Sequence, residues 1–206
     1  MSLLDRMFAK AYPIIIGTSE KKWLREARRD LLEDVRGDVL EIGAGTGLNL
    51  QHYGPAVSSL TLTERSPHML EHLQEAVAKR RPAARVIQAA AESLPAEDDS
   101  ADVIVSTLVL CSVGDVQKAF AEVRRVLRPG GRFVVLEHVA GTGKVARWQH
   151  RIEPFTKFFG RGCHVTRDTR GALERGGFDT GDIKDYWSEH EPKIYAPHIL
   201  GTARPR

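Results

Sequence analysis

The chain has 206 residues, 42% hydrophobic and 28% charged, which is typical of one soluble globular domain with a full core. Its net charge of +3 is spread along the chain, which excludes the concentrated basic face that nucleic-acid binding needs. Two cysteines, Cys111 and Cys163, are too few for a disulfide framework, and we interpret them as reduced thiols of a cytoplasmic protein.

The first 36 residues are interpreted as a helical lid segment. Apolar residues recur there at helical spacing: Leu3, Leu4, Met7, Phe8 and Ala11. Pro13 and Gly17 are expected to end this helix, and a second helix is predicted over 19–34 with Ser19 as its N-cap. A helix lying on a membrane surface is the alternative. No run reaches the roughly 20 apolar residues of a membrane span, and we expect no signal peptide or membrane anchor.

After this segment, predicted strands and helices alternate. Five apolar runs predict strands over residues 38–43, 58–64, 84–89, 101–110 and 132–139. Helices are predicted to begin at Gly47 and to span residues 66–80 and 116–127. Ser66 and Pro67 mark the start of the second helix, and Pro129 with two glycines is expected to stop the third. This alternation predicts a parallel sheet covered by helices on both faces.

The C-terminal part departs from this rhythm. Residues 141–163 are aromatic and basic, and we expect them over the carboxyl edge of the sheet. A helix is predicted within 166–177. Residues 178–188 and 193–203 have no helix between them and are expected to pair as an antiparallel edge hairpin. Residues 37–206 are therefore predicted to form a single α/β domain with a Rossmann-like, doubly wound, mostly parallel seven-stranded sheet.

The stretch VLEIGAGTGLNL, residues 39–50, places three glycines directly after the first strand. Glycine permits a positive φ and lets a ligand approach the backbone, so the loop predicts a nucleotide-type site. A P-loop is excluded because Leu48 and Asn49 stand where lysine and Ser/Thr are required. The spacing is also not that of a dinucleotide loop, and Glu41 just before it suits a cationic ligand group better than a pyrophosphate.

Glu64 ends the second predicted strand. A carboxylate there can accept both hydroxyls of a ribose, whereas the alternative is an acid that only precedes the cap of the next helix. Together with Glu41 and the tight glycine spacing, the ribose interpretation is favoured.

Four segments in order now carry a resemblance to a known family. VLEIGAGTGLN, LTLTERSPHML, AAAESLPAEDDSADVIVSTLVL and EVRRVLRPGGRFVVLEH, between about residues 38 and 138, resemble the motifs of class I S-adenosylmethionine-dependent methyltransferases. The resemblance implies S-adenosyl-L-methionine as cofactor. One departure is Ala90, which stands where many relatives have an aspartate that reaches the adenine.

The resemblance also implies roles for individual residues. The methionine portion would lie against Glu41, Gly43, Ala44, Gly45, Gly47, Asn49 and Thr107. Glu64 would hold the ribose. Contacts around the adenine and the remaining wall would come from Arg65, Met69, Ala91, Glu92, Leu108, Ser112 and Tyr12.

Less general segments narrow the resemblance. STLVLCSV, LEHVAG, GCHVTRDTRGALERGGF and SEKKWLREARRDLL look like the methyltransferase-like-seven group of thiol S-methyltransferases. The resemblance implies a small-molecule thiol as acceptor. Members of that group carry an N-terminal membrane anchor, which this sequence is expected to lack, so membrane contact is not predicted.

Methyl transfer to a thiol needs alignment of three atoms and a thiolate, and a free thiol with a pKa of about 8.5 needs only a modest base. The catalytic candidates are Glu137, His138 and His164, with His138 favoured as the base and a structural histidine as its alternative. His164 and Arg167 could stabilise a thiolate, or simply hold a loop. Cys111 is interpreted as a buried apolar residue, and the alternatives are a transient methyl carrier or a partner of Cys163.

Other functions stay open from the sequence. A small-molecule O-methyltransferase, a phospholipid or quinone N- or C-methyltransferase and a non-catalytic cofactor-binding scaffold are the alternatives. His68 and His72 share a helical face but have no third ligand, so no metal site is predicted.

Overall fold

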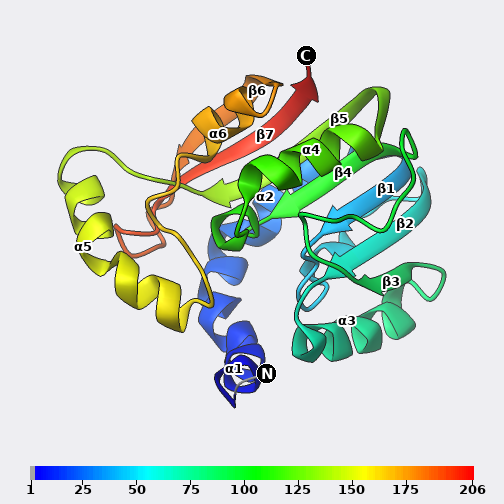
Figure 1. Ribbon diagram of the computed structural model, residues 1–206. Coiled ribbons are helices and arrows are strands. Elements are labelled where there is room, and N and C mark those ends of the chain that lie inside the picture. Colours follow the sequence, from blue (N-terminus) through cyan, green and yellow to red (C-terminus); the bar gives the residue numbers. More distant parts are fainter. Residues whose placement is uncertain (1–2) are drawn as a thin grey trace.

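A computed structural model describes the backbone of residues 3–206, and the side chains in that range apart from residues 3–5, 8, 10 and 13–15 (Figure 1). Part of the apolar stripe predicted for the first helix (the side chains of Leu3, Leu4 and Phe8) therefore lies outside the described residues. No helix in the described part of the chain has both the length and the apolar character needed to cross a bilayer.

The centre of the fold is a seven-stranded sheet in the order β3-β2-β1-β4-β5-β7-β6. The strands are β1 Gly37–Ile42, β2 Val57–Glu64, β3 Arg85–Gln88, β4 Ala101–Thr107, β5 Leu127–His138, β6 Phe178–Trp187 and β7 Pro197–Pro205. Strands β1 to β5 are parallel, while β7 pairs antiparallel with both β5 and β6. The predicted Rossmann-like α/β sheet and its antiparallel C-terminal hairpin are confirmed.

Helices cover both faces of this sheet (Figure 1). They are α1 Leu3–Ser19, the π-helical turn η1 Glu20–Leu24, α2 Arg25–Leu32, the 3-10 turns η2 Leu48–Gln51 and η3 Leu110–Ser112, α3 Pro67–Arg80, α4 Val116–Val126, α5 Gly143–Phe159 and α6 Thr169–Arg175. Alternate strand residues enter two cores: Ile104 packs with α4 and α6, whereas Val103 and Val105 pack with α2 and α3. The apolar runs of the sequence are thus buried from both sides.

Short-range signals explain several element ends. Ser66 caps α3 by accepting from the Met69 N–H at 3.4 Å, and Pro67 occupies the first turn, as predicted. Helix α4 ends at Val126, one residue before the predicted end, and the Pro-Gly-Gly segment lies within β5. Gly47 leads only into the single turn η2 rather than a longer helix.

The N-terminal segment differs most from expectation. Helix α1 continues through Pro13 and Gly17 to Ser19, which has helical φ −64° and ψ −41° and makes no side-chain cap. The predicted break and N-cap are therefore wrong. The continuous path places Trp23 and Leu24 in a core with Leu136 of β5, and this packing offsets the local helix-breaking signals.

Candidate active site

A pocket of about 450 Å³ opens beyond the carboxyl ends of β1, β2 and β4. Helices α1 and α5 lie at the same edge of the sheet (Figure 1). The pocket is lined by many of the residues predicted to bind the cofactor: Tyr12, Gly43, Gly45, Glu64, Arg65, Met69, Ala91, Glu92, Leu108 and Ser112. Thus residues far apart in the sequence meet at the switch point of the sheet, where doubly wound folds bind ligands.

The glycine loop forms the floor beside β1. Gly43, Gly45 and Gly47 have φ of 60°, 58° and 79°, in the left-handed region that favours glycine. At Gly43 a Cβ would also lie 2.7 Å from both methyl carbons of Val109, so a larger residue would displace the turn after β4. The loop therefore presents bare backbone to the pocket.

Glu64 connects this loop to β2. Its Oε2 accepts from the Gly45 N–H at 3.0 Å, and its Oε1 accepts from the Ser66 N–H at 2.7 Å. Burial raises the pKa of this carboxyl above its usual range. The bond to Ser66 is the helix-start role that the sequence left as an alternative, and each oxygen retains a lone pair for a ligand.

Glu41 lies behind the pocket wall. Its carboxylate accepts from Asn49 Nδ2 at 2.9 Å and from the Tyr53 hydroxyl at 2.6 Å, and it is not among the described residues that line the pocket. Thr107 accepts from the same Asn49 amide at 3.0 Å. These three predicted residues form a buried polar network, and their contact with the methionine portion stays a prediction. Ala44 and Gly47 also lie outside the lining.

Arg28 completes this network, and sequence reasoning missed it. The guanidinium is 3% exposed and donates to Glu20 Oε2 at 3.1 Å and to Asn49 Oδ1 and Thr107 Oγ1, both at 2.8 Å. One signal could have found it. Arg28 stands four residues after the buried Leu24 and four before the buried Leu32, which is the core-facing stripe of its helix.

Two of the three catalytic candidates hold the structure around the pocket. Glu137 is fully buried, and its Oε1 accepts from the Ser106 hydroxyl at 2.9 Å and the Val109 and Leu110 N–H groups at 3.0 and 3.1 Å. Burial raises the pKa of this carboxyl to about 7. Glu137 therefore fixes the turn after β4.

His164 lies on the loop between α5 and α6. Its Nδ1 is 3.3 Å from Glu153 Oε1, its backbone N–H donates to the Cys111 carbonyl at 2.9 Å, and burial lowers the pKa of its ring. Arg167 donates to the carbonyls of Leu110 and Val113. Neither His164 nor Arg167 lines the pocket among the residues described. Their contacts match the loop-holding alternative.

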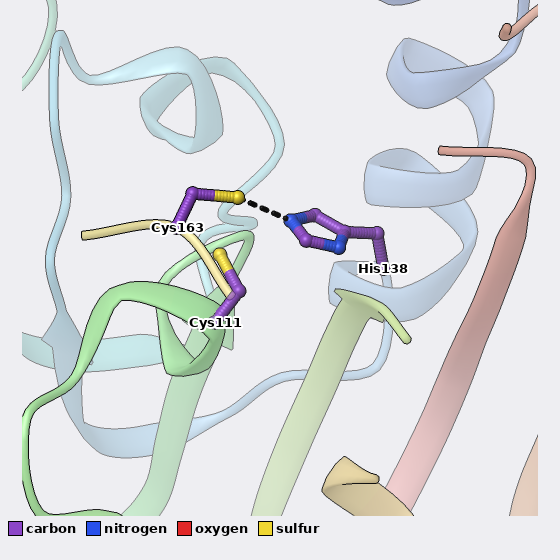
Figure 2. Close-up of side chains that lie close together, drawn as sticks. All are labelled: Cys111, His138 and Cys163. Atoms are coloured by element: carbon purple, nitrogen blue, oxygen red, sulfur yellow. Dashed lines mark hydrogen bonds between the residues drawn. The ribbon is translucent and has the colours of Figure 1, made fainter. Parts of the chain in front are cut away.

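His138 is the catalytic candidate that faces reactive groups (Figure 2). Its Nε2 lies 3.2 Å from Cys163 Sγ, and the ligand atoms of Cys111, His138 and Cys163 all lie within 4.8 Å of one another. Both cysteines are free. A hydrogen bond from Cys163 and the nearby His138 ring hold the pKa of the Cys111 thiol well below its usual range, against the effect of burial. We call these three residues the Cys-His-Cys cluster.

Comparisons with known proteins agree with this geometry. Residues 40–135 match the family described as "Methyltransferase domain". Thiol S-methyltransferase TMT1B of Rattus norvegicus is 35% identical over 93% of this chain and 85% of its own length. Thiol S-methyltransferase TMT1A of Homo sapiens is 36% identical over 80% of this chain and 69% of its own.

A solved structure supports the fold. The crystal structure of a SAM-dependent methyltransferase from Thermotoga maritima, a possible histamine N-methyltransferase, has a TM-score of 0.72 with 19% identity and covers 99% of this chain and 100% of its own. The two thiol S-methyltransferases exceed 30% identity over more than two thirds of their length. The chain therefore belongs to the class I S-adenosylmethionine-dependent methyltransferases, in the family that includes the proteins named thiol S-methyltransferase TMT1A and TMT1B.

Proposed function

We propose that this methyltransferase acts on the sulfur of a small-molecule thiol. The observation that carries the proposal is the extent of the likeness: it continues beyond the methyltransferase core, residues 40–135, to cover 93% of the chain. In this fold the core holds the cofactor, while loops and flanking segments build the acceptor site. Likeness in those segments therefore supports a shared class of acceptor.

The pocket suits S-adenosylmethionine. Its volume of about 450 Å³ is typical of cofactor sites, and it combines bare glycine backbone with the apolar Met69 and Ala91. The free lone pairs of Glu64 can accept ribose hydroxyls. Glu92 Oε1 already accepts from the Gly114 and Asp115 N–H groups at 2.9 and 3.2 Å, which leaves its Oε2 for the predicted contact with adenine.

When bound, the sulfonium of the cofactor supplies an electrophilic methyl group. The chain's own task is to align the acceptor with that methyl, which can supply about 7–11 kcal/mol of the barrier reduction. It must also favour the thiolate form of the acceptor. His138 is the candidate that lies beside the sulfur atoms of the Cys-His-Cys cluster, with its Nε2 3.2 Å from Cys163 Sγ.

Release of S-adenosylhomocysteine by the full chain tests the acceptor. The panel is a set of small alkyl thiols, matched alcohols and amines, phenols, and phosphatidylethanolamine vesicles. We expect turnover with the thiols alone, increasing with pH as the thiolate forms. Turnover only with alcohols, amines, phenols or vesicles would keep the methyltransferase and reject the thiol acceptor.

One surface feature favours a second candidate, an acceptor presented by a membrane. Helix α5 exposes Trp148, Phe155, Phe158 and Phe159 to solvent, and the Arg151 guanidinium lies over the Trp148 ring at 5.8 Å. Aromatic and basic residues together suit a lipid surface. The vesicle arm of the panel decides between the two candidates.

The lid role of the N-terminal segment gives a separate prediction. Tyr12 of α1 lines the pocket, so removing residues 1–18 is expected to raise the dissociation constant of S-adenosylhomocysteine about five- to tenfold, the equivalent of about 1–1.4 kcal/mol of lost contact. Calorimetric titration of truncated and full-length protein measures it. Tyr12→Ala in the full chain should reproduce most of the change, and equal dissociation constants in all three proteins would reject the lid.

A further inference from the structure

The Cys-His-Cys cluster has the composition of a metal site. Cys111 comes from η3, His138 from the end of β5, and Cys163 from the loop between α5 and α6 (Figure 2). Figure 2 shows the two sulfur atoms and the ring directed toward one another. Three side chains that can each donate one ligand atom therefore converge from separate elements.

The distances in the cluster suit a small cation. With Zn–S of about 2.3 Å and Zn–N of about 2.0–2.1 Å, tetrahedral geometry separates the ligand atoms by roughly 3.4–3.8 Å. Here Cys163 Sγ and His138 Nε2 are 3.2 Å apart, and all three ligand atoms lie within 4.8 Å. Small side-chain adjustments would accommodate an ion. Thiolate and imidazole ligands together favour zinc over the hard cations magnesium and calcium.

We propose that Cys111, His138 and Cys163 bind a thiophilic divalent cation of the zinc class, and that its open fourth position binds the acceptor thiol as a thiolate. Three protein ligands with one open position are the arrangement of catalytic rather than structural zinc sites. The second half of this proposal rests on the proposed thiol acceptor, whereas cation binding does not. The proposed cation site also revises the prediction from the sequence that the protein has no metal site.

The cluster adjoins the cofactor pocket. Ser112, which follows Cys111, lines the pocket, and so does Arg161, two residues before Cys163. Cys111 Sγ lies 3.5 Å from Ser112 Oγ. Cys163 is the least buried of the three ligands, so the open position would face that side. A thiol bound there would lie next to the cofactor.

The reaction balances without a further reactant. A thiol that takes the open position loses its proton to solvent, because coordination deprotonates it. An electron pair of the thiolate forms the new S–CH₃ bond while the S–CH₃ bond of the sulfonium breaks, and that bonding pair stays on the departing sulfur. The methylated product is a neutral thioether, a weaker ligand than a thiolate, and it leaves the cation.

Metal titration of the full chain tests the cluster without any acceptor. Protein stripped of metal and reduced with a phosphine is titrated with Co²⁺ and then Zn²⁺. We expect one equivalent of Co²⁺ with thiolate-to-metal charge-transfer bands, displaced by Zn²⁺. Cys111→Ser and Cys163→Ser each remove one of the two thiolates, so each should weaken the bands and should weaken zinc binding by more than about 100-fold, beyond the effect of losing an outer-shell partner.

A matched histidine controls for non-specific binding. His150 is exposed on α5, and His150→Asn should leave the Co²⁺ bands unchanged. Circular dichroism of the stripped cysteine variants shows whether they fold. Absence of charge-transfer bands in the wild-type protein, or zinc binding by folded Cys163→Ser equal to wild type, would overturn the site.

Binding of a thiol at the open fourth position of the cation can be measured separately. Adding 2-mercaptoethanol to the Co²⁺ protein should strengthen the charge-transfer bands, and metal removal should lower methylation of this thiol more than tenfold, with recovery on adding Zn²⁺. Full methylation by stripped protein would overturn the role of the cation and leave the thiol acceptor intact. Co²⁺ binding without methylation of any thiol would reject the proposed acceptor and the thiolate role, and leave the cation site.

Discussion

Replacing Arg28 by alanine is expected to lower the free energy of unfolding by about 3–5 kcal/mol, and the melting temperature by about 10 °C. The Arg28 guanidinium is 3% exposed and pairs with Glu20, which is 5% exposed. Truncation would leave the Glu20 carboxylate buried without its cation, and would remove the donor to Asn49 and Thr107. An uncompensated buried charge is costly because the low-dielectric interior cannot solvate it.

Urea titration followed by circular dichroism measures the loss. Arg29→Ala is the matched control, since Arg29 is the next residue of the same helix and its side chain is 61% exposed; its unfolding free energy should stay nearly unchanged. Arg28→Lys should recover only part of the loss, because an ammonium cannot reproduce the forked geometry of a guanidinium. A loss in Arg28→Ala no larger than in Arg29→Ala would show that the network does not stabilise the fold.

Arg28 also connects the N-terminal segment to the pocket. Arg28 in α2 holds Asn49 beside the glycine loop and Thr107 at the end of β4. Losing it should loosen the wall that the carboxylate of Glu41 supports through Asn49. The N-terminal helices are therefore part of the site's framework as well as a candidate lid.

The sheet and its covering helices could be predicted because their signals are local. Apolar runs such as residues 101–107 are buried on both faces, and the helices between them carry one apolar stripe each. Gly43, Gly45 and Gly47 likewise indicated a binding site, because their positive φ values favour glycine. The order of these elements was enough to place a pocket at the carboxyl edge.

The roles of individual polar residues could not be predicted in the same way. Glu41 and Glu64 both flank the glycine loop. The Glu41 carboxylate accepts hydrogen bonds from Asn49 and Tyr53, whereas Glu64 faces the pocket. Spacing along the chain does not say which hydrogen-bond partners the fold will bring to each oxygen.

The Cys-His-Cys cluster could not be predicted from the sequence for a related reason. Cys163 lies 25 residues from His138, on a loop that folds back against η3 through the His164 N–H and the Cys111 carbonyl. Metal-site patterns in sequences rely on short ligand spacings, and none of these ligands is close to another. Only the tertiary packing of that loop brings the ligand atoms together.

Replacing Glu64 by alanine is expected to raise the dissociation constant of S-adenosylhomocysteine by one to two orders of magnitude, from the loss of about 1.5–3 kcal/mol of charge-assisted hydrogen bonding. Two effects contribute. The carboxylate faces the pocket, where it can accept the ribose hydroxyls, and it also anchors the loop through the Gly45 N–H. Isothermal titration calorimetry measures the total.

A pair of nucleosides separates the two effects. Wild-type protein should bind adenosine more tightly than 2′,3′-dideoxyadenosine, and Glu64→Ala should bind both equally weakly. Loss of affinity by the same factor for both nucleosides would assign Glu64 to loop anchoring alone. An unchanged affinity for S-adenosylhomocysteine would mean that the pocket beside Gly45 is not where the cofactor binds.

The pH dependence of S-adenosylhomocysteine binding tests whether the ionised form of Glu64 holds the ligand. Burial raises the pKa of Glu64, and the ionised carboxylate accepts from hydroxyls more strongly than the protonated form, so affinity should fall as the pH is lowered through that raised pKa. Glu64→Gln retains one acceptor oxygen for the Gly45 N–H but has no proton to gain in this range. Its affinity should be lower than that of wild type at neutral pH and should not show this acid-side decrease, because the amide stays neutral where the carboxylate titrates.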